Sequence, residues 1–342
     1  MSSTETPRPG PAPDRLFELG TAYWASRTLL SAVELGVFAA LAAGPLPVEE
    51  LRDRLGLHRR GARDFLDALV ALDLLDRDND GYRNSAETDL YLDPAKPSYL
   101  GGMLEFHNSS MYLPWATLTE ALRTGEAQTE FKNEEDQFAA VYRDPDRLTA
   151  FLTAMSGYSA GSAIALANTF PWDRYQTFCD LGAAQGMVPV QLALRHPHLR
   201  GVGFDLPQVQ PIFEKFVADS GLSSRVAFSD GDFFADSLPP AQVYVLGHVL
   251  HDWGLDAKRS LLRRAYEALP EGGAVIVYEM MIDDERRTNA AALLMSLNML
   301  VLSHDGFDYT GADCRGWMAE AGFRESYVQH LVGPESMVVG LK

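Results

Sequence analysis

The C-terminal half of the chain alternates short, apolar, β-prone runs with helical segments, starting after Pro171-Trp172. This alternation predicts parallel strands joined by helices, in a sheet that helices cover on both faces. The expected strands are 177–181, 201–204, 225–228, 243–246 and 274–278, and the expected helices are 188–195, 210–218 and 258–269. The sequence therefore predicts an α/β fold class for this half.

The N-terminal part has a helical pattern instead. Apolar residues over 15–41 recur at helical intervals but cover more than one stripe, so one neighbouring element cannot bury them all. Such a segment predicts an intertwined contact with a second copy, that is, a homodimer. Predicted helices at 48–55 and 61–75, followed by a hairpin around Tyr82, have the order of a winged helix. The expected organisation is a disordered tail 1–14, a winged-helix-like dimerisation domain 15–100, a helical linker region 101–170 and the α/β domain 171–342.

A DNA-binding winged-helix regulator is the alternative from a different functional class. Arg59, Arg60 and Arg63 stand where a recognition helix would begin, but Asp64 and Asp67 are interleaved with them. The chain has 47 acidic and 29 basic residues, a net charge of −18, which repels polyphosphates and anionic membranes. We therefore expect neither nucleic acid nor a membrane as a main partner, and a small neutral or cationic ligand instead.

The cysteines and the N-terminus indicate a cytoplasmic protein. Cys179 and Cys314 are far apart and lack the spacing of a zinc site or a disulfide framework. The segment 1–14 has no apolar core of the kind a signal peptide needs. No uninterrupted apolar run approaches the roughly 18 residues of a membrane span.

A glycine-containing turn follows the first predicted strand of the α/β domain, with the sequence D-L-G-A-A-Q-G at 180–186. Open α/β sheets bind ligands at this place, where the carboxyl end of a strand meets the start of a helix. The nicotinamide fingerprint G-x-G-x-x-G is not matched, because Ala184 occupies the middle glycine position and no third glycine follows at the required spacing.

Acidic residues also end the second and third predicted strands. Asp205 suits the two hydroxyls of an adenosine ribose, although an aspartate at a strand end is also a common helix cap. Asp232 and Phe233 place an acid and an aromatic ring at the same edge, as an adenine would require.

The fourth predicted strand leads into G-H-V-L-H-D-W at 247–253. His248 and His251 have a spacing that a metal could use, but no third ligand is evident, so no metal is expected. The series D-x-G-x-x-x-G, F-D-L-P, G-D-x-F and H-D-W resembles the S-adenosylmethionine-dependent small-molecule O-methyltransferases, typified by plant caffeic acid O-methyltransferase and bacterial polyketide-tailoring enzymes. The resemblance covers nearly the whole chain. It implies a Rossmann-like class I methyltransferase domain with an N-terminal α-helical, winged-helix-like dimerisation domain, working as a homodimer with S-adenosylmethionine as cofactor.

The resemblance also implies which residues bind the cofactor: Ser159, Asp180, Gly182, Gly186, Asp205, Leu206, Asp232, Phe233 and Gly247. Two departures from the family pattern stand out. Ala183 and Ala184 replace glycines of the usual turn, and Gly247 replaces a frequent lysine, which removes one possible contact near the adenine.

For catalysis, the resemblance implies His251 as general base and Glu279 as the acid that orients it. Asp308 falls where the family usually has a second glutamate. Residues expected to line the acceptor pocket are Met155, Asp252, Met295, Asn298 and Met299. The expected reaction is methyl transfer to a hydroxyl of a phenolic small molecule in secondary metabolism. C- or N-methylation and a relative that binds the cofactor without transferring methyl stay open, as do a packing role for His251 and a purely strand-ending role for Glu279.

Overall fold

A computed structural model describes residues 12–78, 81–96, 98–129 and 139–342. The chain forms two compact units, Met1–Ser109 and Ser110–Lys342. Most of the predicted tail lies outside the described residues, and its last residue, Asp14, already begins a helix.

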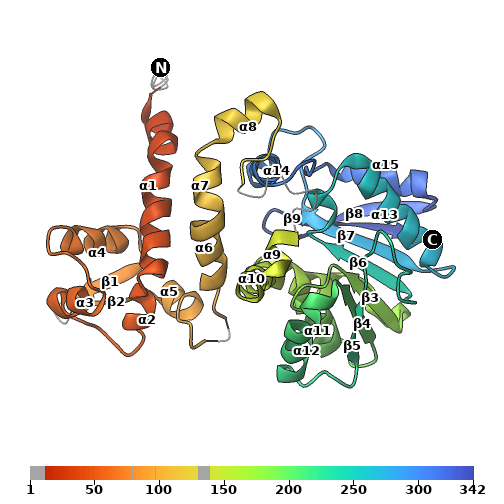
Figure 1. Ribbon diagram of the computed structural model, residues 1–342, viewed down its shortest axis with the longest axis horizontal. Helices are drawn as coiled ribbons and strands as arrows, with labels where there is room; N and C mark the ends of the chain where they lie inside the picture. Colours follow the sequence, from red (N-terminus) through yellow and green to blue (C-terminus); the bar gives the residue numbers. More distant parts are fainter. Residues whose placement is uncertain (1–11, 79–80, 97, 130–138) are drawn as a thin grey trace, which may run out of the picture. The chain divides into compact units, whose positions relative to one another are not determined.

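The N-terminal unit is mainly helical (Figure 1). The helical pattern over 15–41 is not one continuous helix. Gly36 has a left-handed backbone, with φ of 73°, and separates two helices. The predicted helix over 61–75 is too long, since Leu75 instead begins a strand. The elements are α1 (Asp14–Glu34), α2 (Val37–Ala40), α3 (Val48–Arg54), α4 (Ala62–Ala71), β1 (Leu75–Asp78), β2 (Gly81–Asn84), α5 (Ala86–Tyr91) and α6 (Gly101–Phe106).

Helix α1 buries only part of its apolar surface within this unit. Its C-terminal end contributes Ala32 to a core shared with Leu51 of α3, Leu66 of α4 and the hairpin residue Tyr82. Its first half exposes large apolar side chains to between 55% and 73%, namely Leu16, Phe17, Leu19, Tyr23 and Trp24. A contiguous apolar surface of this kind indicates an interaction site.

Helices precede the sheet in the second unit: α7 (Tyr112–Trp115), α8 (Leu118–Thr124), α9 (Ala139–Arg143) and α10 (Pro145–Thr169). Asp144 caps α10 by accepting hydrogen bonds from the amides of Asp146 and Arg147. Among the described helices, α10 alone has the length and apolar composition to cross a membrane. Leu148, Leu152, Leu166 and other side chains of α10 are buried in the protein core, which accounts for this composition.

The central sheet has the strand order β5-β4-β3-β6-β7-β9-β8. The first five strands in this order are parallel, as predicted, at β3 (Thr177–Leu181), β4 (Arg200–Asp205), β5 (Val226–Asp230), β6 (Val243–Gly247) and β7 (Ala274–Met280). The sheet is nevertheless mixed, because it also contains an unpredicted hairpin of β8 (Glu325–Val332) and β9 (Glu335–Leu341). Strand β9 pairs antiparallel with both β7 and β8.

Helices cover both faces of this sheet (Figure 1). One face packs against α10, α11 (Met187–Arg195) and α12 (Gln210–Asp219). The other packs against α13 (Leu255–Ala268) and α15 (Gly311–Ala321), while α14 (Ala290–Leu302) precedes α15 in the chain. The chain crosses to opposite sides of β3 to form β4 and β6, so the carboxyl end of β3 lies at the switch point where such sheets bind ligands.

Candidate active site

The glycine turn after β3 adopts backbone angles that favour glycine. Gly182 and Gly186 have φ of 77° and 99°, and a Cβ atom on them would lie 2.8 Å from Val249 and 2.9 Å from Phe213, respectively. Ala184 is also left-handed, with φ of 47°, and its amide donates a 2.8 Å hydrogen bond to Oδ2 of Asp205. The turn therefore tolerates alanine at 184, because a neighbouring strand end holds its backbone.

Asp205 accepts a second 2.8 Å hydrogen bond, from the amide of Leu206 to its Oδ1 atom. Burial raises the pKa of Asp205 to about 6, against the effect of these two amides. Asp180, on the adjacent strand, is also buried, and burial together with the charge of Asp205 raises its pKa to about 8. Two buried acids at neighbouring strand ends form a site that a positively charged ligand would stabilise.

Ser159 of α10 and Gly247 of β6 lie around Tyr278 of β7. Burial and the charge of Asp180 raise the pKa of Tyr278, whereas hydrogen bonding with Ser159 lowers it. Gly247 pairs with Tyr278 across the parallel strands, and a side chain at position 247 would overlap the tyrosine ring. The ring thus explains why glycine, rather than a long side chain, stands at 247.

Asp232 and Phe233 lie in a tight turn after β5. Oδ1 of Asp232 accepts a 2.8 Å hydrogen bond from the amide of Phe234, which fixes the carboxylate within the turn. Phe233 is half-buried, and its ring lies edge-on to Trp253 with centroids 6.0 Å apart. The acid and the ring sit at the end of the sheet where the glycine turn lies.

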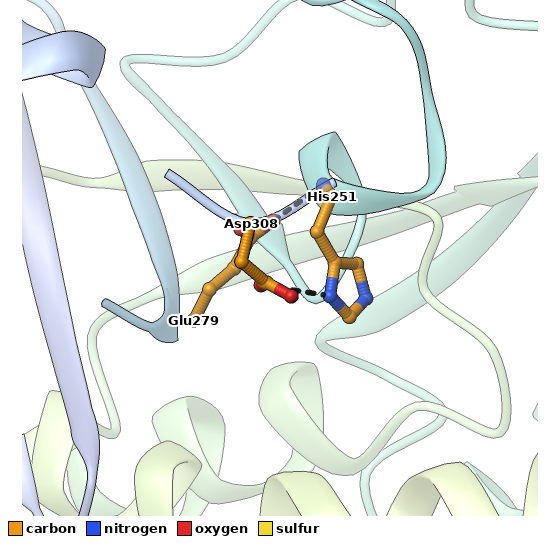
Figure 2. Close-up of side chains that lie close together, drawn as sticks. All are labelled: His251, Glu279 and Asp308. Atoms are coloured by element: carbon orange, nitrogen blue, oxygen red, sulfur yellow. Dashed lines mark hydrogen bonds and ion pairs between the residues drawn. The ribbon is translucent and has the colours of Figure 1, made fainter. Parts of the chain in front are cut away.

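His251, Glu279 and Asp308 come together, although 57 residues separate the first from the last (Figure 2). The ring atom Nδ1 of His251 is 3.2 Å from Oδ1 of Asp308. Glu279 instead accepts a 3.0 Å hydrogen bond from the backbone amide of His251. Asp308 therefore contacts the imidazole, and Glu279 holds the turn, η4 (Leu250–Asp252), that carries it.

Carboxylates control the charge of His251. Burial alone would lower its pKa, but Asp252, Asp308 and Glu279 raise the pKa to about 10. Burial raises the pKa of Glu279 to about 7. The site thus favours a positive charge on the imidazole, the form in which a general base leaves the proton-transfer step.

Ligand atoms of these same side chains lie within 4.8 Å of one another, a spacing that a metal ion could use. The His251 nitrogen nearest the acids is already paired with Asp308, and one oxygen of Glu279 holds a backbone amide. The ring of His248, the other histidine considered from the sequence, has its centroid 5.8 Å from that of His251, and its Nε2 atom lies 3.6 Å from Oε2 of Glu335 on β9. These hydrogen bonds occupy two of the atoms that a metal ion would need.

The residues expected near the acceptor are spread over α10, η4 and α14. Met155 is half-buried on α10, and Asp252 follows His251, with its Oδ1 3.7 Å from the Nε2 atom of that ring. On α14, Oδ1 of Asn298 accepts a 2.7 Å hydrogen bond from the indole of Trp115, and its amide nitrogen contacts the sulfur of Met295. Met299, the residue after Asn298, is buried.

Sequence reasoning missed three buried groups near this site. Glu335 lies on the unpredicted strand β9, and burial and the charge of Glu279 raise its pKa to about 8. The sequence places Tyr278 in a strand but does not indicate that its ring lies at the site. Lys258, in the first turn of α13, is fully buried, which a lysine in a helical pattern does not indicate.

Comparison with known proteins identifies the family. The sequence matches the O-methyltransferase domain over residues 115–324 and the O-methyltransferase dimerisation domain over 17–94. The chain belongs to the O-methyltransferase family. Relatives include the tetracenomycin polyketide synthesis 8-O-methyl transferase TcmO of Streptomyces glaucescens, 45% identical over 96% of this chain and 97% of that protein. The N,N-dimethyltransferase OxyT of Streptomyces rimosus is 41% identical over 92% of each chain.

Among solved structures, human N-acetylserotonin methyltransferase in complex with S-adenosylmethionine superposes with a TM-score of 0.91, at 30% identity over 100% of this chain and 99% of that one. The present chain is therefore an S-adenosylmethionine-dependent O-methyltransferase with a class I methyltransferase domain. The site residues fit this cofactor, because the buried carboxylates of Asp180 and Asp205 suit a ligand that carries positive charge.

Proposed function

We propose that this O-methyltransferase methylates a phenolic hydroxyl of an aromatic, polyketide-type natural product, with His251 as general base. The observation that carries the proposal is the buried hydrogen bond between His251 and Asp308 at the cofactor end of the sheet. The 45% identity with TcmO, named for polyketide synthesis, supports the substrate class.

The strand ends would bind S-adenosylmethionine in three parts. The glycine turn, Asp180 and Ser159 would hold the methionine portion, Asp205 with Leu206 the ribose, and Asp232 with Phe233 the adenine, beside Gly247. When bound, the cofactor supplies a methyl group on a sulfonium, which is electrophilic enough to react with a phenolate. The protein need only align the acceptor oxygen and remove its proton.

His251 would perform the proton removal. A phenol with a pKa of about 10 is mostly protonated at neutral pH, so a base accelerates its attack. The Nε2 atom of the neutral ring accepts the phenolic proton, while Asp308 accepts a hydrogen bond from Nδ1–H and stabilises the imidazolium that forms. Glu279 keeps the ring in place through the backbone amide.

The cofactor assignment predicts the effect of Asp205→Ala. We expect S-adenosylmethionine affinity to fall by roughly 10- to 150-fold, the equivalent of about 1.5–3 kcal/mol for hydrogen bonds to a charged acceptor. Isothermal titration calorimetry measures this directly, with Asp219→Ala on the exposed end of α12 as the matched control. Unchanged affinity together with a lower melting temperature would mean that Asp205 serves only to hold the amides of Ala184 and Leu206.

We further propose that the enzyme is a homodimer joined through the exposed apolar face of α1. An obligate interface of this kind should bury on the order of 2,000 Å² or more. Light scattering at micromolar concentration should give twice the chain mass, and Phe17→Glu should shift it toward the monomer. The neighbouring control Glu18→Gln should not. A wild-type protein that is monomeric and fully active contradicts this proposal.

N-methylation is the second candidate, because OxyT is named an N,N-dimethyltransferase and is 41% identical. Incubation with isotopically labelled S-adenosylmethionine and a panel of phenols, amines and activated carbon acids separates the candidates. Mass spectrometry should find the label on phenolic oxygen. Label on nitrogen or carbon would overturn the proposed acceptor, and cofactor binding without product from any of these acceptors would favour a non-methylating relative.

A further inference from the structure

Lys258 is a buried cation between two segments of the active site. It lies in the first turn of α13 with no exposed surface. Its ammonium group donates a hydrogen bond to the carbonyl of Trp253, and it lies 3.9 Å from the ring centroid of Phe307 and 5.4 Å from that of Tyr309. Lysine is rarely buried to this extent unless it is paired, so these contacts offset the loss of water.

The partners of Lys258 are the sequence neighbours of the catalytic pair. Trp253 follows His251 by two residues, and Phe307 and Tyr309 stand on either side of Asp308. One ammonium group therefore contacts both the turn that carries the imidazole and the loop that carries its acid. The described residues from Ser303 to Tyr309 form no helix or strand. Besides the contacts with Lys258, hydrogen bonds from the amide of Asp308 to Ser296 and from the amide of Ile282 to the carbonyl of Tyr309 hold this loop.

Close backbone packing joins the same two segments. A Cβ atom on Gly306 would lie 2.7 Å from the carbonyl oxygen of His251 and 2.9 Å from that of Asp252. A Cβ atom on Gly254 would overlap the carboxylate of Asp305. The two segments thus meet with no room for intervening side chains, and Lys258 lies across this junction.

The surroundings of Lys258 are acidic. Burial lowers its pKa to about 8, while Glu279 of β7, Asp308 and Asp305 of the loop, and Asp252 of η4 oppose that change. From α15, Cys314 also faces it, and Lys258 acts to lower the pKa of that thiol. Oδ2 of Asp308 is buried and has no hydrogen-bond partner within the described residues. A nearby cation compensates such a carboxylate electrostatically.

We infer that Lys258 is a positioning residue, a buried cation that holds the loop carrying Asp308 against the turn carrying His251 and thereby keeps their hydrogen bond formed before the acceptor binds. The inference rests on the proposed role of His251 as base. It assigns to α13 a part in catalysis that does not involve contact with either substrate.

The test compares Lys258→Met, which keeps most of the unbranched side chain but removes the charge, with Lys258→Arg, which keeps the charge. We expect Lys258→Met to lower kcat at least about tenfold, because small displacements of a catalytic group are costly, with the calorimetric affinity for S-adenosylmethionine unchanged. If the hydrogen bond with Asp308 opens, one cause of the raised His251 pKa is lost, so the rising limb of the pH–rate profile should move to lower pH. Lys258→Arg should restore the wild-type pH profile. The control Arg263→Met, exposed on the same helix, should match wild type.

A merely structural lysine would lower the melting temperature without moving the pH profile of the folded enzyme, and that result would overturn the inference. So would Lys258→Arg with the same shifted profile as Lys258→Met. If Lys258→Met does not fold, Phe307→Leu removes the ring beneath the ammonium group and should lower kcat without changing cofactor affinity; unchanged kcat would overturn the inference. The variant His251→Ala distinguishes a failure of the proposed base from a failure of the positioning role. If His251→Ala is fully active, the proposed function is wrong. If His251→Ala is inactive and Lys258→Met is unaffected, only the positioning role is rejected.

Discussion

Replacing His251 with alanine should lower kcat for a phenolic acceptor by about 10²–10⁴-fold, the usual contribution of a positioned general base. The affinity for S-adenosylmethionine should stay nearly unchanged, because His251 is not among the predicted cofactor residues, most of which lie at the ends of β3, β4 and β5 or in the turns that follow them. In the wild-type enzyme, the rate should rise with pH as His251 loses its proton, since the surrounding acids raise its pKa to about 10. Single-turnover transfer of a labelled methyl group and calorimetry measure the two quantities.

The acidity of the acceptor provides the control for this experiment. A phenol that is already ionised at neutral pH needs no base, so its rate should fall much less in His251→Ala than that of an ordinary phenol. Raising the pH should likewise increase the rate of the variant with an ordinary phenol. A histidine that only packs would, when removed, lower the melting temperature and impair binding and turnover together for all acceptors. A wild-type rate with an ordinary phenol at neutral pH would reject His251 as the base.

Asp308→Asn should lower kcat by about 10²-fold, because an amide neither stabilises the imidazolium as a carboxylate does nor selects the tautomer with a proton on Nδ1. Loss of this negative charge also removes one cause of the raised His251 pKa. The rising limb of the pH–rate profile should therefore move to lower pH, the same direction as the shift expected for Lys258→Met. A pH–rate series at saturating cofactor measures both effects.

Glu279→Gln is the comparison for Asp308→Asn. Glu279 accepts a hydrogen bond from the backbone amide of His251, and a glutamine oxygen can still accept it. We therefore expect a smaller loss of kcat than for Asp308→Asn. The reverse order would show that Glu279, rather than Asp308, maintains the active orientation of the ring.

The strand ends of the α/β domain were predictable because each is a local pattern. β3 has the predicted bounds, and β4, β5, β6 and β7 differ from prediction only at their ends. Once the strands are parallel, the residues that follow them lie at the same edge of the sheet. The sequence therefore predicted the placement of the glycine turn, Asp205 and His251 at one edge without knowledge of the strand order.

The errors arose where a local pattern did not determine the outcome. The break at Gly36 depends on one residue with a left-handed backbone, which apolar spacing does not detect. The strands β8 and β9 are antiparallel and follow the last helix, outside the strand–helix alternation that identified the others. Glu335 was missed for the same reason, since it begins β9.

The sequence by itself determined the family motifs, the α/β class of the C-terminal half and the set of acids at the strand ends, because these depend on short spacings and periodicity. Only the tertiary structure decided which acid contacts the imidazole. Glu279 holds the backbone of His251, and Asp308, far along the chain, reaches its ring. Likewise, burial of Lys258 depends on the packing of α13 against a loop some fifty residues later. Contacts and electric fields between distant segments act through space, so they exist only after the chain has folded.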